Sequence, residues 1–438
     1  MNEFKIIQES IKKGDFQNSL KNLESIYNKN NNNLDCIFLL GNIYYKLNEP
    51  KNSLFYYKKY NQLNPNNILV LLNIGMIFQN LGKFDDAKKI YSKIININPN
   101  VVRAYYGLFS LDENYVNEDV LKKLIFLNSK KEISLFDKSL INLIISKYYK
   151  KINNITKEIE YLNQSHKQSY DSNLNYNRQS DFYYNEIIPK FFNKIKFTEK
   201  NDEFNKYTKS NIIFIIGLPR SGSTFVESLL AQSSNNIKSV GEFHAVNMSI
   251  FDQIAEKIYS PNFDFKSFKF ELDLGLFLNS LKKKYTFSNN HIILDKSLEN
   301  FFNIELILKI FPNAKFLHTF RNYDDSVIAI YQSMLSELSW SHNIESIKKY
   351  INNYKNVIGF FKTKYPKNII DIDIQQLTNS TELEAEKIFK FCNLIWNNKY
   401  LNFSNKKNFF SKTLSFKQIR SKIDKYDDNK YKKYYNLI

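Results

Sequence analysis

The sequence predicts two folds in series: an α-helical repeat solenoid, followed by an α/β domain with a mostly parallel sheet flanked by helices. Turn residues recur at a constant interval in the N-terminal third, which is typical of a solenoid. Farther on, a run of β-branched and aromatic residues at 212–216 breaks into a glycine-bearing loop and then a helix. With 438 residues and 43% hydrophobic content, the chain suits two or three domains. We expect a repeat domain at 1–169, a connecting helix and linker at 170–208, and the α/β domain at 209–438.

The net charge of +18, from 62 Lys and Arg against 44 Asp and Glu, permits a nucleic acid, a membrane surface or an anionic small molecule as partner. The chain is also crowded with Lys, Asn, Ile, Tyr and Phe, so a biased background composition accounts for much of the excess. The basic residues are spread along the chain without a nucleic-acid-binding module. We therefore do not expect a nucleic-acid partner.

The number of cysteines and the lengths of the apolar runs exclude several classes of protein. Cys36 and Cys392 are far apart, which excludes a disulfide scaffold and a CxxC zinc finger. The longest apolar runs fall well short of the roughly 20 residues that a membrane helix needs. Residues 1–5 lack the apolar core and cleavage site of a signal peptide. We expect a soluble, cytoplasmic protein without a membrane span.

The N-terminal third repeats with a period of 34 residues. The equivalent positions are Gly14, Asn48 and Gly82; Gly41 and Gly75; Tyr57 and Tyr91; Pro65 and Pro99; and Ser19, Ser53 and Ala87. Each unit is predicted to be helix, short turn and helix, ending at an Asn-Pro pair. A degenerate continuation is expected to run on, with another helix pair across residues 146–166.

This pattern resembles the tetratricopeptide repeat. One unit cannot bury its own apolar face, so the units must stack. The resemblance implies a concave surface that receives a peptide or protein partner. The alternative is that the repeats only support the domain that follows them.

The loop at 217–224, Gly-Leu-Pro-Arg-Ser-Gly-Ser-Thr, joins the predicted strand to a helix. In this arrangement backbone N–H groups and the positive end of the helix dipole point at an anion. Glycines allow the tight turn and the close approach of backbone to a phosphate. The candidate anion-binding residues are Arg220, Ser221, Gly222, Ser223 and Thr224.

The loop is P-loop-like but differs from a nucleotide P-loop at one position. The nucleotide motif requires Lys where this chain has Ser223. A phosphotransferase needs that Lys and a magnesium ion to neutralise a highly charged phosphate. A less charged sulfuryl group would not need the metal. A phosphotransferase therefore stays only as an alternative.

The sequence Gly-Leu-Pro-Arg-Ser-Gly-Ser-Thr resembles the 5′-phosphosulfate loop of sulfotransferases that use 3′-phosphoadenosine 5′-phosphosulfate (PAPS). From residue 209 onward, the chain is similar to bacterial sulfotransferases that carry tetratricopeptide repeats and, more distantly, to tyrosylprotein sulfotransferases. The resemblance implies transfer of a sulfuryl group from PAPS to an acceptor hydroxyl or amine, without a metal. The acceptor could be a protein tyrosine or another group that a partner presents.

The resemblance also assigns catalytic roles. Glu242, in the segment Val-Gly-Glu-Phe-His, matches the general base. His244 stands where the family usually carries Arg and is a second candidate base, because a neutral imidazole can take a proton near pH 7. Lys296, which with Asp295 follows the predicted strand 291–294, matches the residue that stabilises the leaving phosphate.

Further matches concern the 3′-phosphate of the nucleotide. Arg321 matches the family's Arg, but the Ser expected eight residues later is Ala329, and we expect Ser326 to take its place. In the basic tail, Ser415 and Lys430 are candidate phosphate contacts. Ala329 and His244 also leave open a scaffold protein whose transferase domain has decayed. The remaining histidines and Cys392 are interpreted as packing or surface residues.

Overall fold

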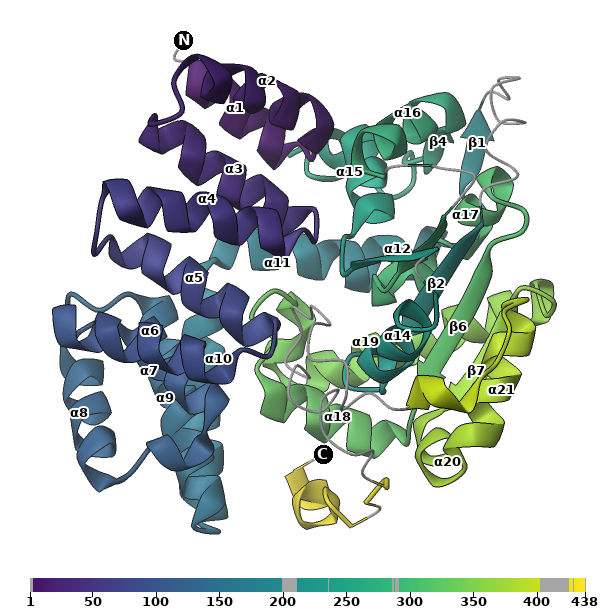
Figure 1. Cartoon of the computed structure of the whole chain (residues 1–438). Helices are drawn as coiled ribbons and strands as arrows, with labels where there is room; N and C mark the ends of the chain where they lie inside the picture. Colours follow the sequence, from purple (N-terminus) through teal and green to yellow (C-terminus); the bar gives the residue numbers. More distant parts are fainter. Residues whose placement is uncertain are drawn as a thin grey trace.

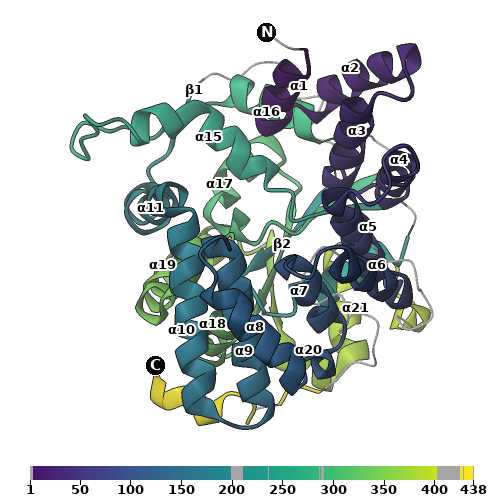
Figure 2. The ribbon, with the colours of Figure 1, turned by 90° about the vertical axis from the view of Figure 1, so that its left-hand side faces the viewer.

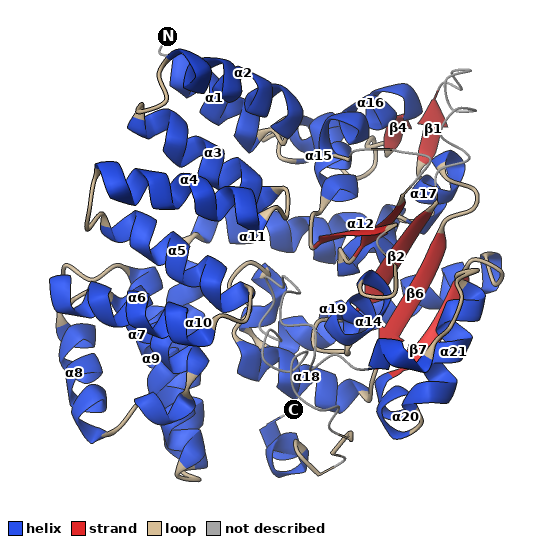
Figure 3. Ribbon diagram, viewed as in Figure 1, coloured by secondary structure: helices blue, strands red, loops and turns tan. Residues whose placement is uncertain are grey.

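The structure is a computed structural model, and it describes residues 3–198, 211–234, 236–285, 287, 291–401, 425–427 and 429–437. The N-terminal helices stack into a curved arm on one side of the molecule, and the sheet lies on the other side (Figure 1). Coloured by secondary structure, all the strands lie in the half opposite the N-terminal arm (Figure 3). The predicted order, a helical solenoid and then an α/β domain, is confirmed.

Ten α-helices form the arm. They are α1 (Glu3–Lys12), α2 (Phe16–Lys29), α3 (Leu34–Lys46), α4 (Pro50–Leu63), α5 (Ile68–Asn80), α6 (Phe84–Ile97), α7 (Val102–Leu111), α8 (Glu118–Ser129), α9 (Leu135–Lys151) and α10 (Ile155–Ser172). The turns inside the first three pairs contain Gly14, Asn48 and Gly82, with φ of 76°, 64° and 76°. This left-handed conformation suits Gly and Asn, which explains the period read from the sequence. The predicted later pair is present as α9 and α10.

A tyrosine of each second helix packs on a glycine of the first. An added Cβ at Gly41 would lie 2.7 Å from the ring of Tyr57, and one at Gly75 would lie 2.7 Å from the ring of Tyr91. The Ser53 hydroxyl also donates to the Gly41 carbonyl oxygen at 2.7 Å. These recurring contacts set the close spacing within each pair.

The chain between the arm and the sheet is largely helical. It comprises α11 (Leu174–Phe182), a π-helical turn η2 (Tyr183–Ile187), α12 (Ile188–Phe191) and strand β1 (Lys196–Thr198). Tyr183 and Ile187 are buried in the main core. The exact domain boundaries stay a prediction.

A five-stranded parallel sheet with the order β3-β5-β2-β6-β7 forms the centre of the second domain. Its strands are β2 (Ile212–Gly217), β3 (Ile237–Gly241), β5 (Ile292–Asp295), β6 (Lys315–Phe320) and β7 (Ile369–Asp373). A small parallel pair joins β1 to β4 (Glu271–Asp273). From β2 the chain continues to β3 and β5 on one side and then to β6 and β7 on the other. A reversal of this kind creates a crevice at the carboxyl ends of the strands, where such folds bind ligands.

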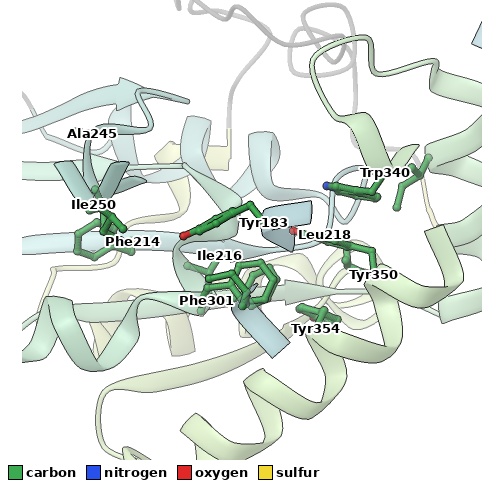
Figure 4. Close-up of a cluster of buried hydrophobic side chains, with 14 of the residues drawn as sticks. Tyr183, Phe214, Ile216, Leu218, Ala245, Ile250, Phe301, Trp340, Tyr350 and Tyr354 are labelled. Carbon is green, nitrogen blue, oxygen red and sulfur yellow. The ribbon is translucent and has the colours of Figure 1, made fainter. Parts of the chain in front are cut away.

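Helices cover both faces of the sheet (Figure 2). The helices of this domain are α14 (Ser223–Ala231), α15 (Ala245–Ile258), α16 (Leu274–Lys284), α17 (Ile304–Ile310), α18 (Tyr323–Ser333), α19 (Ile344–Lys364), α20 (Ile374–Asn379) and α21 (Thr381–Phe391). Short 3₁₀ turns are η1 (Glu113–Tyr115) in the arm, and η3 (Leu298–Phe302), η4 (Ser339–His342), η5 (Asn398–Leu401) and η8 (Lys432–Leu437) after β5. All six residues of β2 are buried, as its unbroken apolar run predicts. Phe214 and Ile216 face an aromatic core with Phe301 and Tyr354 (Figure 4). Within the described ranges, none of the helices combines the length and apolar composition that a bilayer crossing needs.

A pair of buried histidines joins the arm to the α/β domain. His166 of α10 donates from Nε2 to the Tyr331 carbonyl oxygen at 2.8 Å, so its Nδ1 accepts the proton of His342 Nδ1 at 3.1 Å. Burial lowers the pKa of His166 to about 3 and that of His342 to about 4. Both rings are therefore neutral at pH 7.

We predict that Gly75→Ala destabilises the protein, because the new Cβ would meet the ring of Tyr91. The expected cost is about 1–3 kcal/mol from overpacking, against the roughly 1 kcal/mol that Ala gains as a helix former. Gly359→Ala in α19 is the matched control, since its Cβ would meet nothing within 4 Å. The control should leave the melting temperature equal or higher, and an equal rise in both variants would contradict the packing account.

We also predict that acid loosens the junction between the arm and the α/β domain. The rings of His166 and His342 bind protons more readily when unfolded, so their contribution is complete above about pH 6.5 and is lost as the pH falls toward 4. At pH 5.5 the loss is on the order of 1 kcal/mol per ring. Denaturant midpoints at pH 7 and 5.5 should differ less in the double variant His166→Gln, His342→Gln than in the parent chain. Equal differences would argue against this account.

Candidate functional site

The carboxyl ends of the parallel strands open into one cavity of about 1580 Å³. Eight of the residues singled out in the sequence line it: Arg220, Gly222, Ser223, Thr224, Glu242, His244, Arg321 and Lys430. Ser221, Lys296 and Ser326 are buried behind its wall. Ser415 lies outside the described residues, so its role stays a prediction. Residues from separate segments thus meet at one place.

The glycine-bearing loop is held against the neighbouring strand β6. Gly217 has a φ of 139°, and an added Cβ would lie 2.2 Å from the Thr319 carbonyl oxygen. The Ser221 hydroxyl donates to the Leu218 carbonyl oxygen and shares a hydrogen bond with the Thr319 hydroxyl, each at 2.7 Å. The side chain of Ser221 therefore shapes the loop itself.

The loop ends where α14 begins. Gly222 caps the helix in the left-handed conformation, with a φ of 87°, and an added Cβ would lie 2.1 Å from Ile374. Ser223 and Thr224 form the first turn and face the cavity. The positive end of the helix dipole and two hydroxyl groups are therefore directed at the same space, an arrangement that favours an anion.

Arg321 leaves the end of β6 and is held from several sides. Its Nη1 donates to the Arg220 carbonyl oxygen at 3.0 Å, and its Nε donates to the Tyr426 hydroxyl at 3.2 Å. The guanidinium lies 4.9 Å from the centre of the Tyr431 ring, within the range of a cation–π contact. Asp325 lies 3.9 Å from Nη2 and also accepts from the Tyr426 hydroxyl. These contacts fix a cation at the cavity wall.

Tyr426 was not singled out in the sequence. A tyrosine in a Lys-rich tail gives no local sign of its partner, and only the fold brings it beside Arg321. The neighbouring Lys430, which the resemblance did indicate, and Tyr431 also line the cavity. The described part of the tail thus contributes to the same wall as the loop.

The structure places Ser326 and Ala329 away from the cavity surface. The Ser326 hydroxyl donates to the Asn322 carbonyl oxygen at 2.8 Å, one turn earlier in the chain. Ala329 packs in a small cluster with Tyr431 and Tyr434. A phosphate contact from Ser326 would have to break its bond to Asn322, and this role stays a prediction.

Lys296 lies between two carboxylates. Its Nζ is 2.5 Å from Oε1 of Glu242 and 3.6 Å from Oε2 of Glu227. Burial by itself lowers the pKa of Lys296, but the two carboxylates outweigh it and raise the pKa above the ordinary value. The ammonium is therefore charged. The side chain of Glu242 is 45% exposed, so it can reach a molecule in the cavity.

Glu227 is a second residue that sequence reasoning missed. It lies in α14 within the mostly apolar segment 225–230. A carboxylate at such a position was the one feature of the sequence that could have indicated a buried charged residue. The side chain is 6% exposed and accepts from the Ser239 hydroxyl at 2.6 Å. Burial raises its pKa, but Lys296 and the Ser239 hydroxyl oppose this rise because both stabilise the charged carboxylate.

His244 is paired with Glu299. Its Nδ1 lies 2.6 Å from Oε1 of Glu299, which also accepts from Asn247 at 3.1 Å. Partial desolvation at the cavity wall disfavours the charged ring, but the carboxylates around it raise the pKa to about 9. An imidazole that already holds its proton at pH 7 is a poor acceptor for another. Of the two candidate bases, the geometry favours Glu242.

The cavity continues onto the concave side of the arm. Its lining there is aliphatic, aromatic and amide in character, and includes Leu69, Leu72, Asn73, Met76, Tyr106 and Phe136. Arg103, a cation on this side, lies 3.5 Å from Asp137. The repeats and the glycine-bearing loop 217–224, which we call the candidate anion loop, therefore face one shared space.

Two further residues considered in the sequence, His318 and Cys392, lie in the core of the α/β domain. His318, in the middle of β6, contacts Asp371 at 2.7 Å and the Tyr354 hydroxyl, and Cys392 is buried. In the ranges that the structure describes, no group of three or more His, Cys, Asp or Glu side chains is arranged to hold a metal ion.

Comparison with known families agrees with this geometry. Residues 212–398 match the sulfotransferase family, and residues 34–67 and 69–101 match the tetratricopeptide repeat. The α/β part of the chain is a sulfotransferase-family domain. It contains the anion loop, Glu242, Lys296 and Arg321, and it is preceded by tetratricopeptide repeats.

Individual relatives are distant. An uncharacterized protein of Aquifex aeolicus (strain VF5) is 27% identical over 234 residues, which cover 51% of this chain and 30% of that protein. The chain thus spans less than a third of that relative's length. The sulfotransferase STF1 of Mycobacterium tuberculosis H37Rv is 9% identical, with a TM-score of 0.34 over 70% of this chain and 98% of that one. A MamA double mutant is 14% identical, with a TM-score of 0.31 over 39% of this chain and 93% of that one.

We predict that Glu299→Gln lowers the pKa of His244 from about 9 toward or below 6.5, because the carboxylate that stabilises the charged ring is lost. The five histidines make an NMR titration of the ring signals practicable, with His244→Asn identifying the signal. Glu305→Gln, which removes a carboxylate paired with Lys364, is the control and should leave that pKa unchanged. A pKa that stays near 9 in Glu299→Gln would contradict the pairing.

Proposed function

We propose that this protein transfers a sulfuryl group from PAPS to an acceptor hydroxyl. The observation that carries the proposal is the convergence, at one end of the sheet, of the anion loop, Arg321 and the Lys296–Glu242 pair. Membership of residues 212–398 in the sulfotransferase family supports the reaction class.

The residues present suit a donor with two separate anionic ends. In this proposal the loop 217–222 and the first turn of α14 bind the 5′-phosphosulfate, with Arg220 beside it. Arg321 and Lys430, with Ser326 and Ser415, would bind the 3′-phosphate. Helix N-termini and fixed arginines are groups that commonly bind phosphates.

The proposed chemistry is a direct displacement at sulfur. The acceptor oxygen forms a bond to sulfur as the bond between sulfur and the phosphate oxygen breaks. Glu242 takes the acceptor's proton, and Lys296 offsets the negative charge that grows on the leaving phosphate. A preplaced cation of this kind lowers the barrier because it needs no reorganisation during the reaction.

We propose that the acceptor belongs to a polypeptide or is delivered by one. The support is the continuity of the cavity with the concave face of the repeats. Leu69, Leu72 and Met76 form an aliphatic stripe on α5, and the amides nearby can both donate and accept hydrogen bonds. These groups suit apolar side chains and peptide groups of an extended segment.

We predict that Lys296→Ala and Arg321→Ala each lower donor turnover by at least about tenfold, because each removes a cation that offsets phosphate charge. The measurement is release of adenosine 3′,5′-bisphosphate from labelled PAPS, with an extract of the source cells as acceptor. Lys387→Ala and Arg178→Ala, on the outer surface, are matched controls and should keep the parent rate.

Two outcomes would contradict the proposed function. One is the absence of any binding heat with adenosine 3′,5′-bisphosphate up to millimolar concentration. The other is turnover of ATP with magnesium in place of PAPS, which would favour the phosphotransferase alternative. Mass spectrometry of the extract would identify the sulfated acceptor.

A further inference from the structure

A chain of alternating charges lies under the cavity wall. Glu227 of α14 lies 3.6 Å from Lys296, and Lys296 lies 2.5 Å from Glu242. The ammonium is buried, and the two carboxylates differ in exposure: 6% for Glu227 and 45% for Glu242. One counter-ion of Lys296 is thus fixed in the interior, and the other faces the cavity.

Glu227 also connects the elements that carry the site. Its Oε1 accepts from the Ser239 hydroxyl in β3, and that hydroxyl oxygen accepts from the Gly241 amide at 3.2 Å. The Lys296 amide in turn donates to the Gly241 carbonyl oxygen at 3.0 Å. Glu242 follows Gly241 directly. A single carboxylate therefore links the helix of the anion loop to the ends of both neighbouring strands.

The contact between Lys296 and Glu242 creates a conflict for the proposed reaction. A carboxylate held at 2.5 Å by an ammonium is a weak proton acceptor, because the cation favours its charged form. Taking the acceptor's proton would also remove the negative charge opposite Lys296. A buried ammonium without a counter-ion is strongly disfavoured.

The other carboxylates near Lys296 form hydrogen bonds or ion pairs with other residues. Asp295 accepts from the Tyr285 hydroxyl at 2.5 Å and from the Ser297 amide at 2.7 Å. Glu299 is paired with His244. Of the carboxylates that the structure describes, Glu227 and Glu242 lie within 4 Å of Lys296. Glu227 is therefore the group that can keep the ammonium paired while Glu242 reacts.

We propose that Glu227 is a positioning residue: it holds Lys296 charged and in place, so that Glu242 can release the lysine and accept the proton of the acceptor. This inference rests on the proposed sulfuryl transfer. It assigns the two carboxylates different tasks, a permanent counter-ion inside and an exchangeable one at the cavity.

Glu227→Gln tests the proposal, because the amide keeps the shape and can still accept from Ser239. We expect kcat to fall by at least about tenfold, since Glu242 becomes the sole counter-ion of Lys296. The affinity for adenosine 3′,5′-bisphosphate, measured by calorimetry, should stay equal or increase, because a negative charge near the anion is lost. A folded Glu227→Gln protein that loses bisphosphate affinity together with kcat would overturn the proposal, because a positioning role does not require weaker nucleotide binding.

A double-mutant cycle with Lys296→Met gives the second readout. If Glu227 acts through Lys296, Glu227→Gln should change kcat by less than about twofold in the Lys296→Met background. Ser239→Ala is the control, because it removes the hydrogen bond and keeps the charge, and it should retain kcat within about threefold. An equal loss from Glu227→Gln in both backgrounds would overturn the proposal.

Two further outcomes are distinguishable. If Glu227→Gln does not fold, Glu227→Asp is the second variant, because it keeps the charge on a shorter side chain. We expect it to lower kcat without weakening bisphosphate binding. Parent-level kcat in a folded Glu227→Asp protein would overturn the positioning role. If the parent chain neither binds the bisphosphate nor turns over PAPS, the proposed function itself fails. An active parent with an equally active Glu227→Gln variant refutes the role of Glu227 alone.

Discussion

The close approach of Gly217 to Thr319 is the constraint on which the site depends. The carbonyl oxygen of Thr319 lies where a side chain would begin, so the chain can turn sharply out of β2 at this point. The Ser221 and Thr319 hydroxyls then fasten the loop to β6. Because the loop is fixed to β6, the first turn of α14 and Arg321 at the end of β6 keep a constant relation to each other.

A second set of contacts joins the end of the cavity that Lys430 lines to the arm. Tyr434, near the end of the chain, donates to buried Glu158 of α10 at 2.7 Å, and Gln332 of α18 donates to the same carboxylate. Lys147 and Lys150 of α9 reach Gln332 at 2.5 and 2.7 Å. The tail that carries Lys430 therefore packs on the arm as well as on the sulfotransferase-family domain. This contact gives the arm a structural connection to the site, in addition to its contribution to the cavity lining.

The features predicted from the sequence are those with local causes. The 34-residue period follows from left-handed turns at Gly14, Asn48 and Gly82, and each turn selects Gly or Asn within its own unit. The loop after β2 was recognisable because a strand, glycines and a helix start lie next to one another in the chain. Lys296 and Arg321 were singled out because they match residues of the sulfotransferase family and because they follow apolar strands, which end at a common edge of a parallel sheet.

The residues that were missed depend on partners far away in the sequence. Glu227 contacts Lys296 and Ser239. Tyr426 forms hydrogen bonds with Arg321 and Asp325. The spacing of residues along the chain does not predict these contacts. The charged state of His244 has the same origin, because it depends on a carboxylate 55 positions later.

By itself, the sequence determined the repeat solenoid, the parallel α/β domain and the position of the glycine-bearing loop, because each depends on short-range patterns of turn, strand and helix. It also carried an excess of 18 positive charges, without indicating which of them matter. The tertiary structure decided how the charges are paired: Lys296 lies between an interior and an exposed carboxylate, and Arg321 is held by aromatic groups of the tail. Pairing depends on distances of a few ångströms between separate elements, and only the packed fold sets those distances.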